Sequence, residues 1–290
     1  MNHRVWFVGL AGLTTACGGA ETSPESAEAT YELEFRPTVQ GADFSCAKQY
    51  SGIGTGDAAI QVLDFRLWLH DVALVRADGE QVSLKLDESR PTQTIADRGS
   101  WQRDGVALLD FEDATGSCEG TPETNLKIVG SAPAHDDYVG LSFKVGVPSE
   151  LNHLDATTAP YPFGMPGMAW QWKSGYRFVR IDVATDKFPK YYFHLGSTAC
   201  DGEIGAFECQ VKNVAEIALE GFVPGSSQLE VDLASIYDEL DVDVMGEQTT
   251  ACMSGGTTNP LCPSMFGAFG LGYGEHSPAA QRFFRVVEGK

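Results

Sequence analysis

The sequence predicts an all-β protein, with an antiparallel β-sandwich folded as a single domain with long loops. Short apolar runs recur along the chain, turn residues such as Gly and Asp interrupt them, and long helical periodicity is hard to find. Many short strands separated by turns are typical of a sandwich or a barrel. No internal repeat or linker divides the chain after residue 31.

The expected strands follow from apolar spacing. Residues 31–37 alternate between apolar and charged side chains, as a half-buried strand does. Residues 60–74 form a longer apolar run, and Asp78-Gly79 marks a turn before a strand at residues 82–86. Further strands are expected at residues 106–111, 138–145, 176–183, 190–194, 214–219 and 228–232.

Composition excludes one class of function. The 290 residues include 20 Lys and Arg against 40 Asp and Glu, a formal net charge of −20. A phosphate backbone would be repelled by such a surface, so we expect no nucleic-acid partner. The same repulsion argues against direct docking on anionic lipids. Hydrophobic residues make up 43% of the chain, which is enough for a folded core.

The N-terminus resembles a bacterial export signal. Arg4 precedes a short apolar stretch at residues 5–15, and small residues flank Cys17, as in a lipoprotein signal, although Thr14 stands where Leu is usual. We therefore expect a signal peptide at residues 1–16, lipidation of Cys17, a disordered tether at residues 17–30 and the sandwich at residues 31–290. The predicted location is the cell envelope, as a periplasmic or outer-membrane lipoprotein that touches the membrane only through its lipid anchor. A plain cleaved signal peptide is the alternative.

Six cysteines remain if Cys17 carries lipid, an even number suited to an oxidising compartment. They are Cys46, Cys118, Cys200, Cys209, Cys252 and Cys262. One hypothesis pairs the two closely spaced couples, Cys200 with Cys209 and Cys252 with Cys262, and leaves Cys46 for Cys118. Six cysteines allow 15 connectivities, so the sequence leaves this pairing open.

The chain carries no HExxH, GxSxG or Walker motif, and we expect a binding protein rather than an enzyme. Imidazoles are good ligands for copper and zinc, which directs attention to the histidines. His70, His153 and His194 have the most suggestive surroundings, whereas His135 and His276 rank last. Strand alternation places Trp68 and His70 on one face, while the competing interpretation of each tryptophan is a core aromatic residue.

Several short stretches together resemble the MbnP family, which is found beside methanobactin operons with a di-haem, MauG-like enzyme of the MbnH type. They include Trp68-Leu69-His70-Asp71 within residues 64–72, Trp101-Gln102, residues 107–112, Asn152-His153, Trp170-Gln171-Trp172 and residues 193–200. The family is described by a four-cysteine pattern, and six candidates leave its assignment open. The resemblance implies a role like that of the copper proteins CorA and MopE, which bind copper through histidines and a kynurenine made from tryptophan.

This resemblance sets the functional expectation. Copper is bound by His70 and His153, with His194 as a third ligand or a group beside the ligands. One of Trp68, Trp170 and Trp172 is converted to kynurenine by the di-haem partner, because an indole N–H only donates whereas the aniline nitrogen of kynurenine has a lone pair. The alternative is a surface lipoprotein whose sandwich binds a polysaccharide or a protein.

Overall fold

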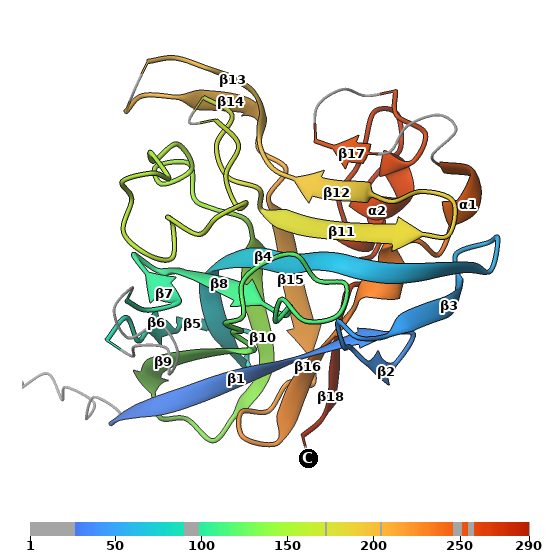
Figure 1. The fold of residues 1–290 in the computed structure, drawn as a ribbon. Coiled ribbons are helices and arrows are strands. Elements are labelled where there is room, and N and C mark those ends of the chain that lie inside the picture. Colours follow the sequence, from blue (N-terminus) through green and yellow to red (C-terminus); the bar gives the residue numbers. More distant parts are fainter. Residues whose placement is uncertain are drawn as a thin grey trace, which may run out of the picture.

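The computed structural model describes residues 27–89, 99–171, 173–203, 205–245, 251–254 and 258–289. Two large sheets and one hairpin make up the molecule (Figure 1). The expected all-β class is confirmed, and a continuous apolar core joins the sheets. The predicted signal peptide and Cys17 lie outside the described residues. No helix in the described ranges is long and apolar enough to cross a membrane.

The first sheet has six strands, in the order β18-β16-β1-β9-β6, with β2 paired to β1. Its strands are β1 (Glu28–Val39), β2 (Ala42–Asp43), β6 (Lys85–Leu86), β9 (Lys127–Pro133), β16 (Ser227–Asp232) and β18 (Phe284–Glu288). Strand β1 begins inside the segment predicted as a tether. Residues 28–30 pair with β9, so order begins earlier than expected.

The second sheet has ten strands and follows the order β15-β10-β4-β11-β12-β17, with β3, β5 and β8 also paired to β4 and β7 paired to β8. Its strands are β3 (Gln49–Ile53), β4 (Ala58–Arg76), β5 (Gln81–Ser83), β7 (Gln102–Arg103), β8 (Val106–Asp110), β10 (Tyr138–Val145), β11 (Val179–Thr185), β12 (Tyr191–Leu195), β15 (Ala215–Glu220) and β17 (Ala251–Met253). Most pairs are antiparallel, as predicted, but β1–β16 and β12–β17 are parallel.

Strand β4 is the long central strand of the larger sheet. Its first half pairs with β11 and its second half with β10, while β8 pairs with the middle. The 33-residue connection 146–178 between β10 and β11 has no long strand in its described residues and lies at the upper left of Figure 1. We call it the covering loop. It packs against β4 through the aromatic contacts described below, and so shapes the candidate site.

The remaining elements are a hairpin and short helices. Strands β13 (Thr198–Asp201) and β14 (Glu208–Val211) form the hairpin, which projects at the top of Figure 1. The helical elements are the 3-10 helix η1 (Leu233–Ile236), α1 (Val242–Met245) and α2 (Cys262–Ala268).

All three proposed cysteine pairs are confirmed. Disulfides join Cys46 to Cys118, Cys200 to Cys209 and Cys252 to Cys262. The second crosses the β13–β14 hairpin, where its two cysteines are direct cross-strand neighbours. The third ties the edge strand β17 to α2.

Candidate metal centre

Trp68 and His70 project from the same face of β4. Their partners in β8 are Leu108 and Val106, without a register shift between the two pairs, so strand alternation holds through this stretch. The pairing of β4 changes partner at Trp68: its N–H donates to the carbonyl of Phe178, and its carbonyl accepts from Gly146. The ends of the covering loop are therefore attached to the backbone of the predicted site.

The indole of Trp68 is fully buried, with 0% relative exposure. Phe163 stacks on it at a centroid distance of 5.4 Å, and Tyr176 meets it edge-on at 5.5 Å. Both of these rings belong to the covering loop. The indole nitrogen Nε1 has no hydrogen-bond partner, and a buried donor left unpaired costs about 1–3 kcal/mol. Trp68 is thus a core aromatic residue whose indole nitrogen lacks a hydrogen-bond partner.

His70 is also buried, with 6% relative exposure, and neither of its ring nitrogens has a hydrogen-bond partner. Nδ1 lies 3.4 Å from Oδ2 of Asp71, outside hydrogen-bond geometry. Burial lowers the pKa of His70 and outweighs the opposing effect of Asp71. The ring is therefore neutral near pH 7, with a lone pair available for a metal.

A β-bulge follows His70 directly. In the pairing of β4 with β10, His70 faces Lys144 and Ala73 faces Ser142, so β4 has one extra residue between these pairs. Asp71 adopts a φ of 50° there and turns its carboxylate outward, where Lys144 binds it at 3.0 Å. Bulges often direct side chains at functional sites. This one ends the regular strand at His70.

His153 lies in the covering loop and is half-buried. Its Nε2 lies 3.3 Å from Sγ of Cys209 and 3.3 Å from the side-chain nitrogen of Asn152, and its ring packs on Phe207. The neighbouring Asn152 accepts a hydrogen bond from the backbone of Tyr176, whose ring contacts Trp68. His153 therefore belongs to the segment that covers Trp68, but it faces the β13–β14 hairpin.

His194 lies outside this neighbourhood. In the sheet, His194 of β12 is paired with Arg180 of β11, and Arg180 is in turn paired with Arg66 of β4. Its backbone is thus two strands across from β4 and four residues along from His70, roughly 16 Å away by standard strand spacings. Both ring nitrogens are also occupied: Nε2 lies 2.7 Å from Asp182, and Nδ1 accepts from Arg177. The geometry does not bring His194 to His70, so we do not carry it forward as a ligand.

Trp170 is the partly exposed tryptophan of the covering loop. The guanidinium of Arg177 lies 5.1 Å from its ring centroid, and His194 lies 6.3 Å away, centroid to centroid. Its surroundings are therefore those of His194 rather than of Trp68. Trp172, the third candidate for oxidation, lies outside the described residues.

The comparisons with known proteins decide the family. The family model of MbnP matches residues 28–254, well over half of the chain. The chain belongs to the MbnP family. The solved structure of MbnP from Methylosinus trichosporium has a TM-score of 0.77 and 28% sequence identity to this chain, and the match covers 91% of this chain and 100% of that one. No curated protein matches the chain.

This MbnP-family protein contains one group of three potential ligands with donor atoms within 4.8 Å of one another, as far as the described residues extend. The group consists of His153, Cys200 and Cys209. The two cysteines are joined in a disulfide, and only the thiolate form of cysteine is a strong metal ligand. The three predicted histidines form no such cluster. The candidate centre therefore rests on Trp68 and His70, with His153 in the loop that packs on Trp68.

Sequence reasoning missed a buried polar layer beside this site in the MbnP-family fold. Asp64 and Arg66 share the face of Trp68 and bind each other, while Arg180 and Asp182 extend the layer on β11. Asp110 of β8 faces Arg66 and is fully buried, with neither carboxylate oxygen hydrogen-bonded, and desolvation raises its pKa well above the usual range. The sequence did contain a signal for this layer, because charged residues occupy alternate positions of an otherwise apolar run.

Proposed function

We propose that this protein binds copper at the Trp68–His70 face of β4 and acts as a copper carrier or store rather than as an enzyme. One observation carries the proposal: three ring nitrogens of two neighbouring side chains on this face are buried without hydrogen-bond partners. Buried polar groups are normally satisfied, and a bound ion is one of the common explanations for an unsatisfied group in a native structure, beside ordered water and backbone strain. The residues present therefore fit a soft or borderline metal ion.

The donor set is suited to copper. His70 offers a neutral imidazole, which is a good copper ligand, whereas Ca²⁺ and Mg²⁺ prefer oxygen ligands. Two carboxylates near the site already bind cations, since Asp71 binds Lys144 and Asp64 binds Arg66. His153 is the proposed second ligand from the covering loop. It would have to turn from Cys209 to reach the ion.

The third ligand would come from a modified tryptophan. Conversion of Trp68 to kynurenine would break the indole C2–C3 bond: peroxide or dioxygen would supply two oxygen atoms, and hydrolysis would release the C2 carbon as formate. The net change is one oxygen gained and one carbon lost, and it replaces an indole N–H by an amine with a lone pair. We propose a di-haem enzyme of the MbnH type as the catalyst of this oxidation. Because Phe163 and Tyr176 cover Trp68, the enzyme cannot touch this ring while the loop is in place. Electrons would leave through the protein, or the covering loop would open.

The proposed location is outside the cytoplasm, either periplasmic or extracellular. Three disulfides support an oxidising compartment. The lipid anchor on Cys17 remains a prediction from the sequence, and mass spectrometry of the mature N-terminus tests it.

The decisive experiment is a copper titration of the purified protein. Cu(I) is titrated without oxygen against a chromophoric chelator, and Cu(II) is followed by electron paramagnetic resonance. We expect one copper per chain, lost in His70→Leu and retained in the matched control His276→Leu, whose side chain is exposed. Full stoichiometry and affinity in the double variant His70→Leu, His153→Leu would refute the site.

Intact mass with peptide mapping tests the modification separately. Protein made together with its di-haem partner should gain about 4 Da on a single tryptophan. The peptide containing Trp68 should carry the change, and a gain on the peptide of Trp170 and Trp172 would assign the modification to the rival motif. An unchanged mass in copper-loaded protein would remove kynurenine from the ligand set.

A further inference from the structure

A second feature is a surface pocket of about 830 Å³, formed where the covering loop meets β13 and β17. Twelve residues line it, among them Trp170, Lys173, Arg177 and Met253. Its volume lies within the usual range of about 300–1,000 Å³ for small-molecule sites. Neither Trp68 nor His70 lines it, so it is separate from the proposed copper site.

The charge of this pocket is opposite to that of the whole chain. Among the residues that the structure describes, its lining includes Lys173 and Arg177 and no Asp or Glu, although the chain has 40 acidic residues and a net charge of −20. A concave surface that carries charge of one sign concentrates the field and attracts the opposite ion. The acidic remainder of the surface would repel an anion, so this pocket is the favourable place for one.

Both cations lack a carboxylate partner within the described ranges, although most other arginines of the fold form ion pairs. Arg177 is held by neutral acceptors: Nε donates to His194, and Nη1 donates to the carbonyls of Gly167 and Ala169. Burial, assisted by the charge of Arg180, lowers the pKa of Arg177 to about 10. This is the behaviour of a partly desolvated cation without a counter-ion.

The rest of the pocket offers apolar contact. The indole of Trp170 lies against Arg177, and Gly196 leaves room for its edge, since a Cβ there would lie 2.5 Å from Cζ3. Met253, also in the lining, is 43% exposed, and the flexible methionine side chain adapts its shape to an apolar ligand. We propose that this pocket binds a small organic anion with a planar apolar body, its carboxylate, sulfonate or phosphate lying between Lys173 and Arg177.

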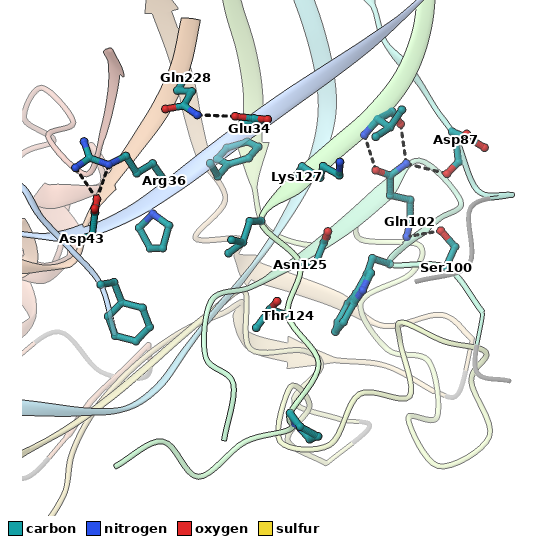
Figure 2. A pocket seen from close by; sticks show the side chains of 17 residues that line it. Glu34, Arg36, Asp43, Asp87, Ser100, Gln102, Thr124, Asn125, Lys127 and Gln228 are labelled. Atoms are coloured by element: carbon teal, nitrogen blue, oxygen red, sulfur yellow. Dashed lines mark hydrogen bonds and ion pairs between the residues drawn. The ribbon is translucent and has the colours of Figure 1, made fainter. Parts of the chain in front are cut away.

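A pocket elsewhere on the molecule provides an internal control. It has about 880 Å³ and lies against β1 and β9 (Figure 2). Its cations are already neutralised, because Arg36 binds Asp43 and Lys127 binds Glu32. Asp87 and Glu34 add further negative charge to its lining. A pocket of similar size whose lining has three carboxylates against two cations is expected to show no preference for anions.

The test is isothermal titration calorimetry of the purified full chain with naphthalene-2-sulfonate and with its uncharged counterpart naphthalene-2-sulfonamide. We expect one sulfonate per chain, weaker binding at high salt, and markedly weaker binding of the sulfonamide. Lys173→Gln and Arg177→Gln should each raise the Kd about tenfold or more, the usual effect of losing a hydrogen bond to a charged group. Lys127→Gln, in the control pocket, should leave the Kd unchanged.

Because Arg177 also anchors the covering loop, Arg177→Gln could alter the fold. Lys173 is exposed, so Lys173→Gln decides the question alone if circular dichroism detects a change in the arginine variant. Equal affinity for the sulfonamide, wild-type affinity in Lys173→Gln, or no saturable binding at millimolar sulfonate would each overturn the proposal. Copper is not needed in this experiment, and its result is independent of the copper site.

Discussion

Replacing His70 by Leu should make the metal-free protein more stable while it removes copper binding. His70 is buried, and neither ring nitrogen has a hydrogen-bond partner. In the unfolded chain water satisfies both nitrogens, so the native state bears their full desolvation cost. Leucine has a similar volume and no polar atom, and it therefore removes this cost without creating a large cavity.

The magnitude follows from the two unpaired atoms. Each buried polar group without a partner costs about 1–3 kcal/mol, and a change of shape at constant volume costs less than about 1.5 kcal/mol. The two atoms together cost about 2–6 kcal/mol, so after the cost of the changed shape we expect His70→Leu to raise the free energy of unfolding by about 0.5–6 kcal/mol. His194→Leu is the matched comparison. It removes the hydrogen bonds that the buried imidazole makes with Asp182 and Arg177, and should lower the free energy of unfolding by about 2–4 kcal/mol.

Urea unfolding of the metal-free proteins, with disulfides intact, measures both values. A slope of about 3 kcal/mol per M, typical of a chain this long, turns 1 kcal/mol into a midpoint shift of about 0.3 M. A loss of more than about 1.5 kcal/mol in His70→Leu would refute the reasoning, because it would mean that the imidazole has a stabilising partner. A gain in stability together with loss of copper would exclude misfolding as the reason for the lost metal.

Three further predictions use other parts of the fold. Asp110→Asn should raise stability at pH 7, and its advantage should grow as the pH rises above the ordinary carboxyl range towards the raised pKa of the folded protein. The raised native pKa means that the folded state binds this proton more tightly than the unfolded state, so the wild type loses stability as pH rises above the ordinary carboxyl range; urea midpoints measured over this rise in pH test it, and a constant difference would contradict it. Replacing both Cys46 and Cys118 by Ala should lower the free energy of unfolding by about 4 kcal/mol, and replacing both Cys200 and Cys209 by about 3 kcal/mol. The difference arises because the first disulfide joins residues 72 apart in sequence and the second joins residues only 9 apart. Equal urea midpoints for the two double variants would argue against this entropic account. Gly196→Ala should displace Trp170 and lower stability by about 1–3 kcal/mol, since its Cβ would collide with the indole and with the carbonyl of Tyr176; an unchanged Trp fluorescence spectrum would show that the ring has not moved.

Strands with strong apolar spacing were predictable from the sequence, and their ends were less so. The run at residues 60–74 became β4 (Ala58–Arg76), and the Asp78-Gly79 turn leads into β5 as expected. The predicted strand at 176–183 begins only at Val179, because Tyr176 instead bridges to Ala169 and packs on Trp68. Strands β9 and β18 and helix α2 were not predicted. They are short, and tertiary pairing rather than local pattern specifies them.

The sequence by itself determined the all-β class, the common face of Trp68 and His70, and the residues that carry the family resemblance. These depend on the two-residue period of a strand and on local residue types, which the chain specifies without knowledge of the fold. Only the tertiary structure decided which cysteines pair, that His194 is bound to Asp182 and Arg177 away from His70, and that the covering loop packs on Trp68. Distances between residues far apart in the chain depend on strand order and register, and no local pattern encodes them.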